Sequence, residues 1–270
     1  MFVLEKKGQN IWCGRFSLFP EDLVTHAVST RFGGVSQGPF ASLNLALHVG
    51  DDGEDVAVNR RRFCEALGLD AAQLCTAEQV HADRIARVTR AEAGRGSRLY
   101  ADALPGTDAL MTNEPGLPLM LFFADCTPVL LFDPVHRAAA LAHGGWKGTV
   151  RSIAAKTVAA MGAAYGTRPA DCLAAIGPSI GPCCYEIGDE VAGQFQQAMP
   201  QFASEILQQK NRHIRLNLWQ ANACQLVSAG LVPEHIETAE TCTSCNSQVF
   251  FSYRADGGKT GRIAAVIALK

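Results

Sequence analysis

The chain has 270 residues, 48% of them hydrophobic and 19% charged, with a formal net charge of −2 and an isoelectric point of about 6.4. This composition is typical of a soluble globular protein that buries a core without disulfides. The slight acidity removes the electrostatic basis for a nucleic-acid or anionic-membrane partner. No run reaches the ~18 apolar residues of a membrane span, and the opening MFVLEKKGQN lacks the apolar stretch of a signal peptide.

The first predicted element is a strand over residues 23–30, which ends in a glycine turn. A helix over residues 52–67 follows, with Asp51 or Asp52 as its cap and Gly68 as its stop. The middle of the chain is rich in predicted strands, at 74–80, 85–89, 109–112, 119–124, 129–132 and 138–143. After these we expect a helix over 149–164, a strand over 172–176, helices over 189–198 and 218–229, and strands over 236–239, 249–253 and 263–269.

The order of these elements bears on the fold class. Strands outnumber helices and the two do not alternate regularly, which argues against a Rossmann or TIM-barrel architecture. Two sheets covered by helices on their outer faces fit better. No repeat or clear linker interrupts the sequence, so we expect one α+β domain over residues 1–270.

Three short stretches each place a possible metal ligand at the end of a predicted strand: Gln79-Val80-His81, Ala124-Asp125-Cys126 and His143-Gly144-Gly145-Trp146. Strands fix ligand geometry while the adjoining loops leave access. One thiolate and two imidazoles suit zinc or copper, and three protein ligands with an open fourth position are typical of a catalytic zinc site. The three residues are too far apart for a zinc finger. The alternative is a pair of hydrogen-bonded core histidines and an inert buried cysteine.

Ten cysteines without an export signal indicate reduced cytosolic thiols. Five of them are expected to be small buried hydrophobic residues: Cys13, Cys64, Cys75, Cys172 and Cys224. The pair Cys183-Cys184 and the spaced pair in Cys242-Thr243-Ser244-Cys245 offer a second, four-thiolate zinc site. Against that site stands the fact that adjacent cysteines rarely both bind one metal.

The three stretches resemble those of the YfiH/LACC1 family, also called multicopper polyphenol oxidases or laccase-domain proteins. The resemblance covers nearly the whole chain, from Ser29-Thr30-Arg31-Phe32-Gly33-Gly34-Val35-Ser36 to Gly261-Arg262. Between these ends it includes Ser42-Leu43-Asn44-Leu45, Asn59-Arg60, Thr107-Asp108-Ala109, Ala124-Asp125-Cys126-Thr127-Pro128, Gly177-Pro178-Ser179-Ile180-Gly181, Tyr185-Glu186-Ile187-Gly188, Cys242-Thr243 and Phe251-Ser252-Tyr253-Arg254.

The resemblance implies a layered α/β/β/α sandwich of mixed sheets covered by helices. It implies metal ligands at His81, Cys126 and His143, with zinc as the metal and copper as the alternative. The implied activities are phosphorolysis of adenosine, inosine, guanosine and methylthioadenosine, and deamination of adenosine. We therefore expect a cytoplasmic monomer or homodimer whose partners are a purine nucleoside and phosphate.

Site roles follow from these two reactions. Deamination needs an acid/base, and Asp125 is the carboxylate nearest to Cys126 in sequence, although a structural role or one of orienting a ligand is the alternative. Phosphorolysis needs groups that hold an anion. Together with the three ligands, Asp125 is therefore a catalytic candidate, and the candidates for substrate binding are Arg31, His48, Lys147, Arg254 and Arg262. Lys147 stands where the family usually has arginine, so its role is the least secure.

Three other functions compete with this hypothesis. A metal-free cysteine hydrolase or amidase would use Cys126 as nucleophile and His143 as base. A copper oxidase acting on phenols would need many histidine ligands, often in His-x-His pairs, whereas the chain has seven histidines and none in such a pair. A binding module with a structural zinc would need a fourth ligand, and the sequence offers no obvious one.

Overall fold

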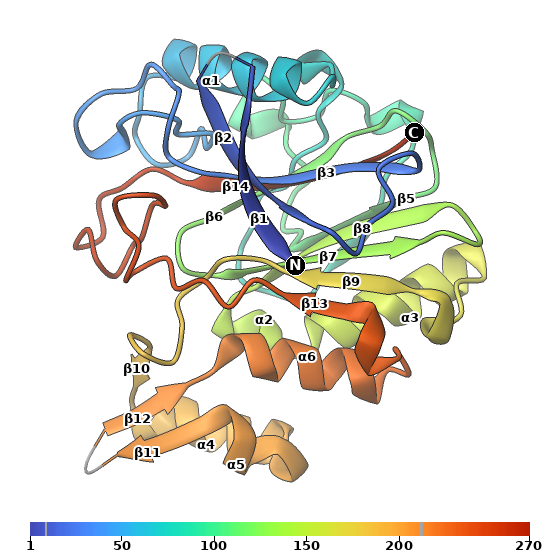
Figure 1. Cartoon of the computed structure of the whole chain (residues 1–270), viewed down its shortest axis with the longest axis vertical. Coiled ribbons are helices and arrows are strands. Elements are labelled where there is room, and N and C mark those ends of the chain that lie inside the picture. The colour runs from blue at the N-terminus through green and yellow to red at the C-terminus, as the bar shows by residue number, and fades with distance from the viewer. Residues whose placement is uncertain (9, 211–212) are drawn as a thin grey trace.

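The computed structural model describes residues 1–8, 10–210 and 213–270. Within them the chain forms six α-helices and three sheets, and two large sheets are stacked between helices (Figure 1). The predicted layered α+β architecture is thereby confirmed. No helix in the described part is long and apolar enough to cross a membrane.

The first large sheet has five strands, and every neighbouring pair in it is antiparallel. Its inner strand β14 (Ile263–Leu269), which lies between β3 and β6, is buried along its whole length, as its unbroken apolar sequence favours. In spatial order the strands are β1 (Phe2–Lys7), β2 (Ile11–Phe16), β3 (Val24–Ser29), β14 (Ile263–Leu269) and β6 (Leu119–Phe123).

The second large sheet has six strands and is mixed. Its inner neighbours are antiparallel, while the outermost pair at each edge is parallel. In spatial order the strands are β13 (Ile236–Thr238), β9 (Leu173–Ile176), β7 (Thr127–Asp133), β8 (Ala138–Gly144), β5 (Ala109–Thr112) and β4 (Ile85–Arg87).

The core lies between the two sheets and beneath the helices on each side. Side chains alternate between the faces of a strand, and in β7 both faces are buried. Leu130 packs in the cluster between the sheets with Leu121 and Ile263. Val129 and Leu131 pack in the cluster beneath α3 (Ile153–Tyr165) and α6 (Leu218–Ser228). This burial on both faces explains why β7 and β8 have nearly continuous apolar sequences.

Helices cover the outer faces. On one side lies α1 (Gly53–Ala66), whose cap Asp52 accepts a hydrogen bond from the Glu54 amide at 2.8 Å. On the other side lie α2 (Trp146–Val150), α3 (Ile153–Tyr165) and α6 (Leu218–Ser228). The prediction of one helix over 149–164 was wrong, because Ser152 adopts a left-handed backbone (φ 62°) that separates α2 from α3.

A small three-stranded sheet extends from the helical side of the sandwich (Figure 1). It consists of β10 (Glu186–Ile187), β12 (His213–Leu216) and β11 (Leu207–Lys210), and it carries α4 (Asp189–Ala198) and α5 (Ala203–Ile206). Short 3₁₀ helices join other elements at Gly38–Phe40, Ala71–Gln73, Arg90–Glu92, Tyr100–Asp102, Pro169–Asp171, Pro200–Phe202 and Pro233–His235.

Two predicted strands, at 74–80 and 249–253, are irregular in the structure. The first runs beside β6, where the Gln79 side chain replaces backbone pairing. Its amide donates to the Phe122 carbonyl and its carbonyl accepts from the Phe122 amide, both at 2.8 Å. The second segment consists of turns, although Phe250 and Phe251 are buried in the core. Five further strands, β1, β2, β10, β11 and β12, were not predicted from the sequence.

Candidate active site

His81, Cys126 and His143 come from three separate segments and meet at one end of the six-stranded sheet. Strands β7 and β8 pair with Pro128 opposite His143, so Cys126, just before β7, lies beside the end of β8. One possible ligand atom from each of the three residues lies within 4.8 Å of the others. Cys126 Sγ is 4.0 Å from His81 Nδ1, and the two imidazole centroids are 4.7 Å apart.

Asp108, at the start of β5, fixes two of these residues. Its buried carboxylate accepts from His143 Nδ1 at 2.8 Å and from the His81 backbone amide at 3.0 Å. It also accepts from the amides of Val80 and Ala82. Since Nδ1 of His143 is occupied, Nε2 is the ring nitrogen left for a metal or a proton transfer. The hydrogen bonds lower the pKa of Asp108 even though burial opposes its ionisation.

The backbone is strained at both loops that carry the site. His81 and Asp125 have left-handed φ values of 59° and 82°, which residues other than glycine adopt at a cost. At His81 the three amide hydrogen bonds to Asp108 stabilise this conformation. At Asp125 the conformation separates the end of β6 from the start of β7, so Asp125 and Cys126 are not alternate residues of one strand.

Cys126 and His143 favour each other's charged forms. Burial opposes ionisation of the thiol, but the positive charge of His143 and hydrogen bonds to both histidines lower the pKa of Cys126 to about 6. Burial also opposes protonation of His143, yet the Cys126 thiolate and Asp108 raise the pKa of His143 to about 9. Each side chain thus favours the charged form of the other, and the thiolate is the form that binds metals.

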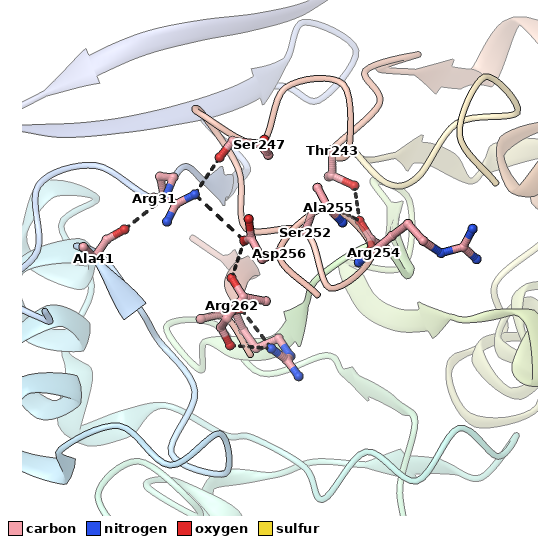
Figure 2. Close-up of polar contacts among 12 residues, drawn as sticks. Arg31, Ala41, Thr243, Ser247, Ser252, Arg254, Ala255, Asp256 and Arg262 are labelled. Carbon is pink, nitrogen blue, oxygen red and sulfur yellow. Dashed lines mark hydrogen bonds and ion pairs between the residues drawn. The ribbon is translucent and has the colours of Figure 1, made fainter. Parts of the chain in front are cut away.

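Asp125 faces a loop from the C-terminal part of the chain. Its Oδ1 accepts from the hydroxyls of Thr243 and Ser252, and its Oδ2 accepts from the Arg254 backbone amide, each at 2.7 Å. Figure 2 shows Thr243, Ser252 and Arg254 close to one another. Both carboxylate oxygens thus have partners in the loop, and none of these partners is a histidine.

A cavity of about 540 Å³ opens beside the trio. Its volume lies within the ordinary range for a small-molecule site. Among the predicted substrate-binding residues, His48, Arg254 and Arg262 line it, and so does Asp125. The other lining residues are Gln79, His81, Phe122, Ala124, Cys126, His143, Trp146, Ile180, Tyr185, Leu218 and Tyr253.

The two arginines in the cavity are held by aromatic rings and backbone carbonyls. The Arg254 guanidinium lies 5.4 Å from the Tyr185 ring centroid and donates to the carbonyls of Cys184 and Glu186, both at 3.3 Å. The Arg262 guanidinium lies 5.7 Å from the Tyr253 centroid, and burial lowers its pKa. These contacts hold two cationic groups in the cavity wall.

Arg31 and Lys147 are not among the described residues that line this cavity. Arg31 donates to the carbonyls of Ala41 and Ser247 at 3.0 and 2.6 Å, and it stacks on Phe251 with its guanidinium carbon 4.6 Å from the ring centroid. Its guanidinium lies beside Ser247 and Asp256, apart from that of Arg254 (Figure 2). Lys147 is exposed on α2, with its ammonium nitrogen 5.6 Å from the Trp146 ring centroid. Neither residue lines this cavity, and their roles in substrate binding stay predictions.

Gly145 leaves the space in which the ligands meet. A Cβ at this position would lie 3.0 Å from both Cys126 Sγ and His81 Nδ1. We expect Gly145→Ala to lower metal affinity about tenfold or more, because overpacking costs about 1–3 kcal/mol. Titration with a metal-sensitive dye measures this affinity. Gly193→Ala is the control, since a Cβ there meets nothing within 4 Å; equal affinities in the two variants would show that Gly145 does not shape the site.

The family described as multi-copper polyphenol oxidoreductase laccase has a sequence model that matches residues 25–270. The chain belongs to this family. Among its relatives, purine nucleoside phosphorylase YlmD of Geobacillus stearothermophilus is 42% identical over 89% of this chain and 88% of that protein. Purine nucleoside phosphorylase YfiH of Escherichia coli is 33% identical over 89% and 91%. The crystal structure of YlmD from Geobacillus stearothermophilus matches with a TM-score of 0.95 and 38% identity, covering all of both chains.

Other residues of the site in this laccase-family chain were not identified as functional from the sequence. Asp108 was noted only within the motif Thr107-Asp108-Ala109, and its link to His143 depends on the pairing of β5 with β8. Tyr185 and Tyr253 also stand in quoted motifs, without a role. A buried acidic residue directly before an apolar strand is the signal that could have indicated Asp108.

Proposed function

We propose that the chain is a zinc-dependent purine nucleoside phosphorylase that also deaminates adenosine. One observation carries the proposal. The possible ligand atoms of His81, Cys126 and His143 lie close together in the wall of a cavity, and two arginines and several aromatic rings line the same cavity. The names of the relatives support phosphorolysis. The proposed substrates are adenosine, inosine, guanosine and methylthioadenosine, with phosphate.

The donor set of His81, Cys126 and His143 fits zinc, which accepts nitrogen and sulfur ligands together, and copper is the alternative. Asp108 would orient His143 toward the ion, as carboxylates commonly do for histidine ligands. When bound, the metal would supply a Lewis acid at the cavity wall. The low pKa of Cys126 keeps the thiolate available near neutral pH.

In phosphorolysis a phosphate oxygen forms a bond to C1′ of the ribose while the bond from C1′ to the purine nitrogen breaks. Arg254 and Arg262 would hold the phosphate, because fixed guanidinium groups bind anions strongly. Trp146 and Tyr253 offer faces for the purine and the ribose. Desolvation and the charges of Arg262 and Arg60 lower the pKa of His48 to about 4, so a neutral His48 can both donate and accept a hydrogen bond.

We assign Asp125 to loop organisation rather than proton transfer. Its two oxygens already accept three hydrogen bonds from the segment that carries Ser252 and Arg254. It would therefore hold Arg254 at the cavity. This assignment replaces the earlier expectation that Asp125 serves as the acid/base of deamination.

The deciding experiment incubates metal-replete protein with adenosine, with and without phosphate, and separates the products by chromatography. Adenine that forms only with phosphate supports phosphorolysis, and inosine supports deamination. The absence of both products, with inosine and guanosine also unreacted, would reject the proposed function. Protein from which metal has been removed by a chelator, and the same protein after zinc is restored, provide the test of metal dependence.

Arg254→Ala should raise the KM for phosphate about tenfold or more, because a hydrogen bond to a charged group contributes about 1.5–3 kcal/mol. Initial rates at varied phosphate and fixed inosine measure this value. Lys147→Ala is the matched control, since Lys147 is a basic residue outside the cavity. A larger effect of Lys147→Ala than of Arg254→Ala would contradict the placement of the phosphate.

The second candidate function is a metal-free cysteine hydrolase or amidase. The spatial arrangement of Cys126, His143 and Asp108 supports it. The thiol of Cys126 interacts with the imidazole of His143, and the carboxylate of Asp108 orients that imidazole. Cysteine nucleophiles use the same arrangement. Stoichiometric metal in active protein favours the phosphorylase. Covalent modification of Cys126 by a substrate in fully active metal-free protein, detected by mass spectrometry, favours the hydrolase.

A further inference from the structure

Four cysteines outside the cavity form a second cluster. Cys183, Cys184, Cys242 and Cys245 place their Sγ atoms within 4.8 Å of one another. The Sγ atom of Cys245 lies 3.4 Å from those of both Cys183 and Cys184. All four are free thiols in the structure, and Cys183 and Cys245 are exposed.

The spacing of the sulfurs fits one tetrahedral ion. Zinc–sulfur bonds of about 2.3 Å place neighbouring sulfurs about 3.8 Å apart at the corners of a tetrahedron. The distances of 3.4 Å are close to this value, and they are far longer than the ~2.05 Å of a disulfide bond. Cys245 is also equally close to two partners, so the geometry does not select one disulfide.

The backbone is arranged as in a thiolate metal site. Cys242 Sγ accepts hydrogen bonds from the amides of Gly181 at 3.2 Å and Cys245 at 3.5 Å. Such amide donors stabilise thiolate ligands and orient them. In the sequence, the adjacency of Cys183 and Cys184 counted against a shared site. In the structure the two residues lie in a tight turn, in which the amides of Cys184 and Tyr185 both donate to the Gly181 carbonyl. Both thiols belong to the same cluster.

Two arginines contact the backbone of the cluster. Arg215 donates to the Cys183 carbonyl, and Arg254 donates to the Cys184 carbonyl at 3.3 Å. Four thiolates around one divalent cation carry a net charge of about −2, so two nearby guanidinium groups compensate it.

We propose that Cys183, Cys184, Cys242 and Cys245 bind one structural zinc ion. The ion would join two segments that also meet through a parallel bridge between Ser179 and Cys242. These segments supply Ile180, Tyr185, Tyr253 and Arg254 to the cavity wall. The second ion would therefore brace one side of the cavity, and its binding does not depend on the proposed reaction.

The test is metal analysis of the full-length chain purified in the presence of a reductant. We expect two zinc equivalents per wild-type chain and one in each of Cys245→Ser and Cys126→Ser. Cys224→Ser, which alters a cysteine outside both clusters, should keep two. Circular dichroism confirms folding, and Cys183→Ser serves as a second variant because Cys183 is also exposed.

Cobalt substitution identifies the ligands of each ion, because the intensity of the thiolate-to-cobalt absorption rises with the number of thiolates. Cobalt-loaded Cys126→Ser should keep most of this absorption, and Cys245→Ser should lose most of it. The proposal is overturned if reduced wild-type protein holds a single equivalent that Cys126→Ser abolishes. It is equally overturned if folded Cys245→Ser and Cys183→Ser both retain two equivalents.

Discussion

We expect Cys126→Ser to empty the proposed metal site of His81, Cys126 and His143 and to lower the rate of the proposed phosphorolysis by at least about a hundredfold, while the fold is retained. The reason is chemical, because a serine hydroxyl is not ionised near neutral pH and is a poor ligand for zinc. Changes to residues that merely support metal ligands already cost about 10–100-fold in metal affinity or activity. Losing one of three ligands should cost more.

Metal content by elemental analysis and rates of inosine phosphorolysis measure these effects. Cys172→Ser is a suitable control, since Cys172 is a buried thiol in the cluster beneath α3, outside the cavity. His81→Ala should behave like Cys126→Ser. Full activity in either ligand variant would rule out a mechanism that depends on this metal site.

Asp108→Asn will both destabilise the protein and weaken metal binding, although the shape of the side chain is unchanged. Each Asp108 oxygen accepts two hydrogen bonds, so an amide group in place of either oxygen would point its hydrogens at existing donors. Breaking a buried charged pair in this way costs about 3–5 kcal/mol of the free energy of unfolding. We expect metal affinity to fall about 10–100-fold as well.

Urea unfolding of the metal-free protein and zinc titration of the folded protein separate the two effects. Asp102→Asn provides the control, because Asp102 is an exposed acidic residue nearby in sequence. A loss of stability with unchanged zinc affinity would mean that Asp108 supports the fold but does not position His143. An unchanged free energy of unfolding would contradict the role of Asp108 altogether.

Several elements could be predicted because local sequence decides them. The strands over 109–112 and 263–269 and the helix over 189–198 match β5, β14 and α4 in their bounds, since each has an apolar pattern between clear stop signals. The hairpin of β1 and β2 was missed because half of β1 is charged and none of its residues is buried, so its strand character comes from pairing. The expectation of buried Cys13, Cys64, Cys75, Cys172 and Cys224 is confirmed.

The segment at 74–80 shows the opposite error. Leu74, Cys75 and Ala77 are buried as in a strand. The segment nevertheless has only isolated bridges to its neighbours, and Gln79 supplies the pairing with Phe122 through its side chain. A side-chain amide offers the same donor and acceptor as a peptide group. The residue pattern is the same whether backbone groups or a side-chain amide form the hydrogen bonds to the neighbouring strand, so it does not distinguish the two.

By itself the sequence determined the family and the candidate ligands with the segments that carry them, because motifs identify the family and chemistry restricts which side chains can bind a metal. Only the tertiary structure decided which charged residues serve the cavity. Arg254 and Arg262 line it while Arg31 and Lys147 do not, and Asp108 rather than Asp125 orients His143. The physical reason is that these roles are hydrogen bonds and cavity contacts between segments far apart in the chain, and their partners are set by sheet register and loop packing.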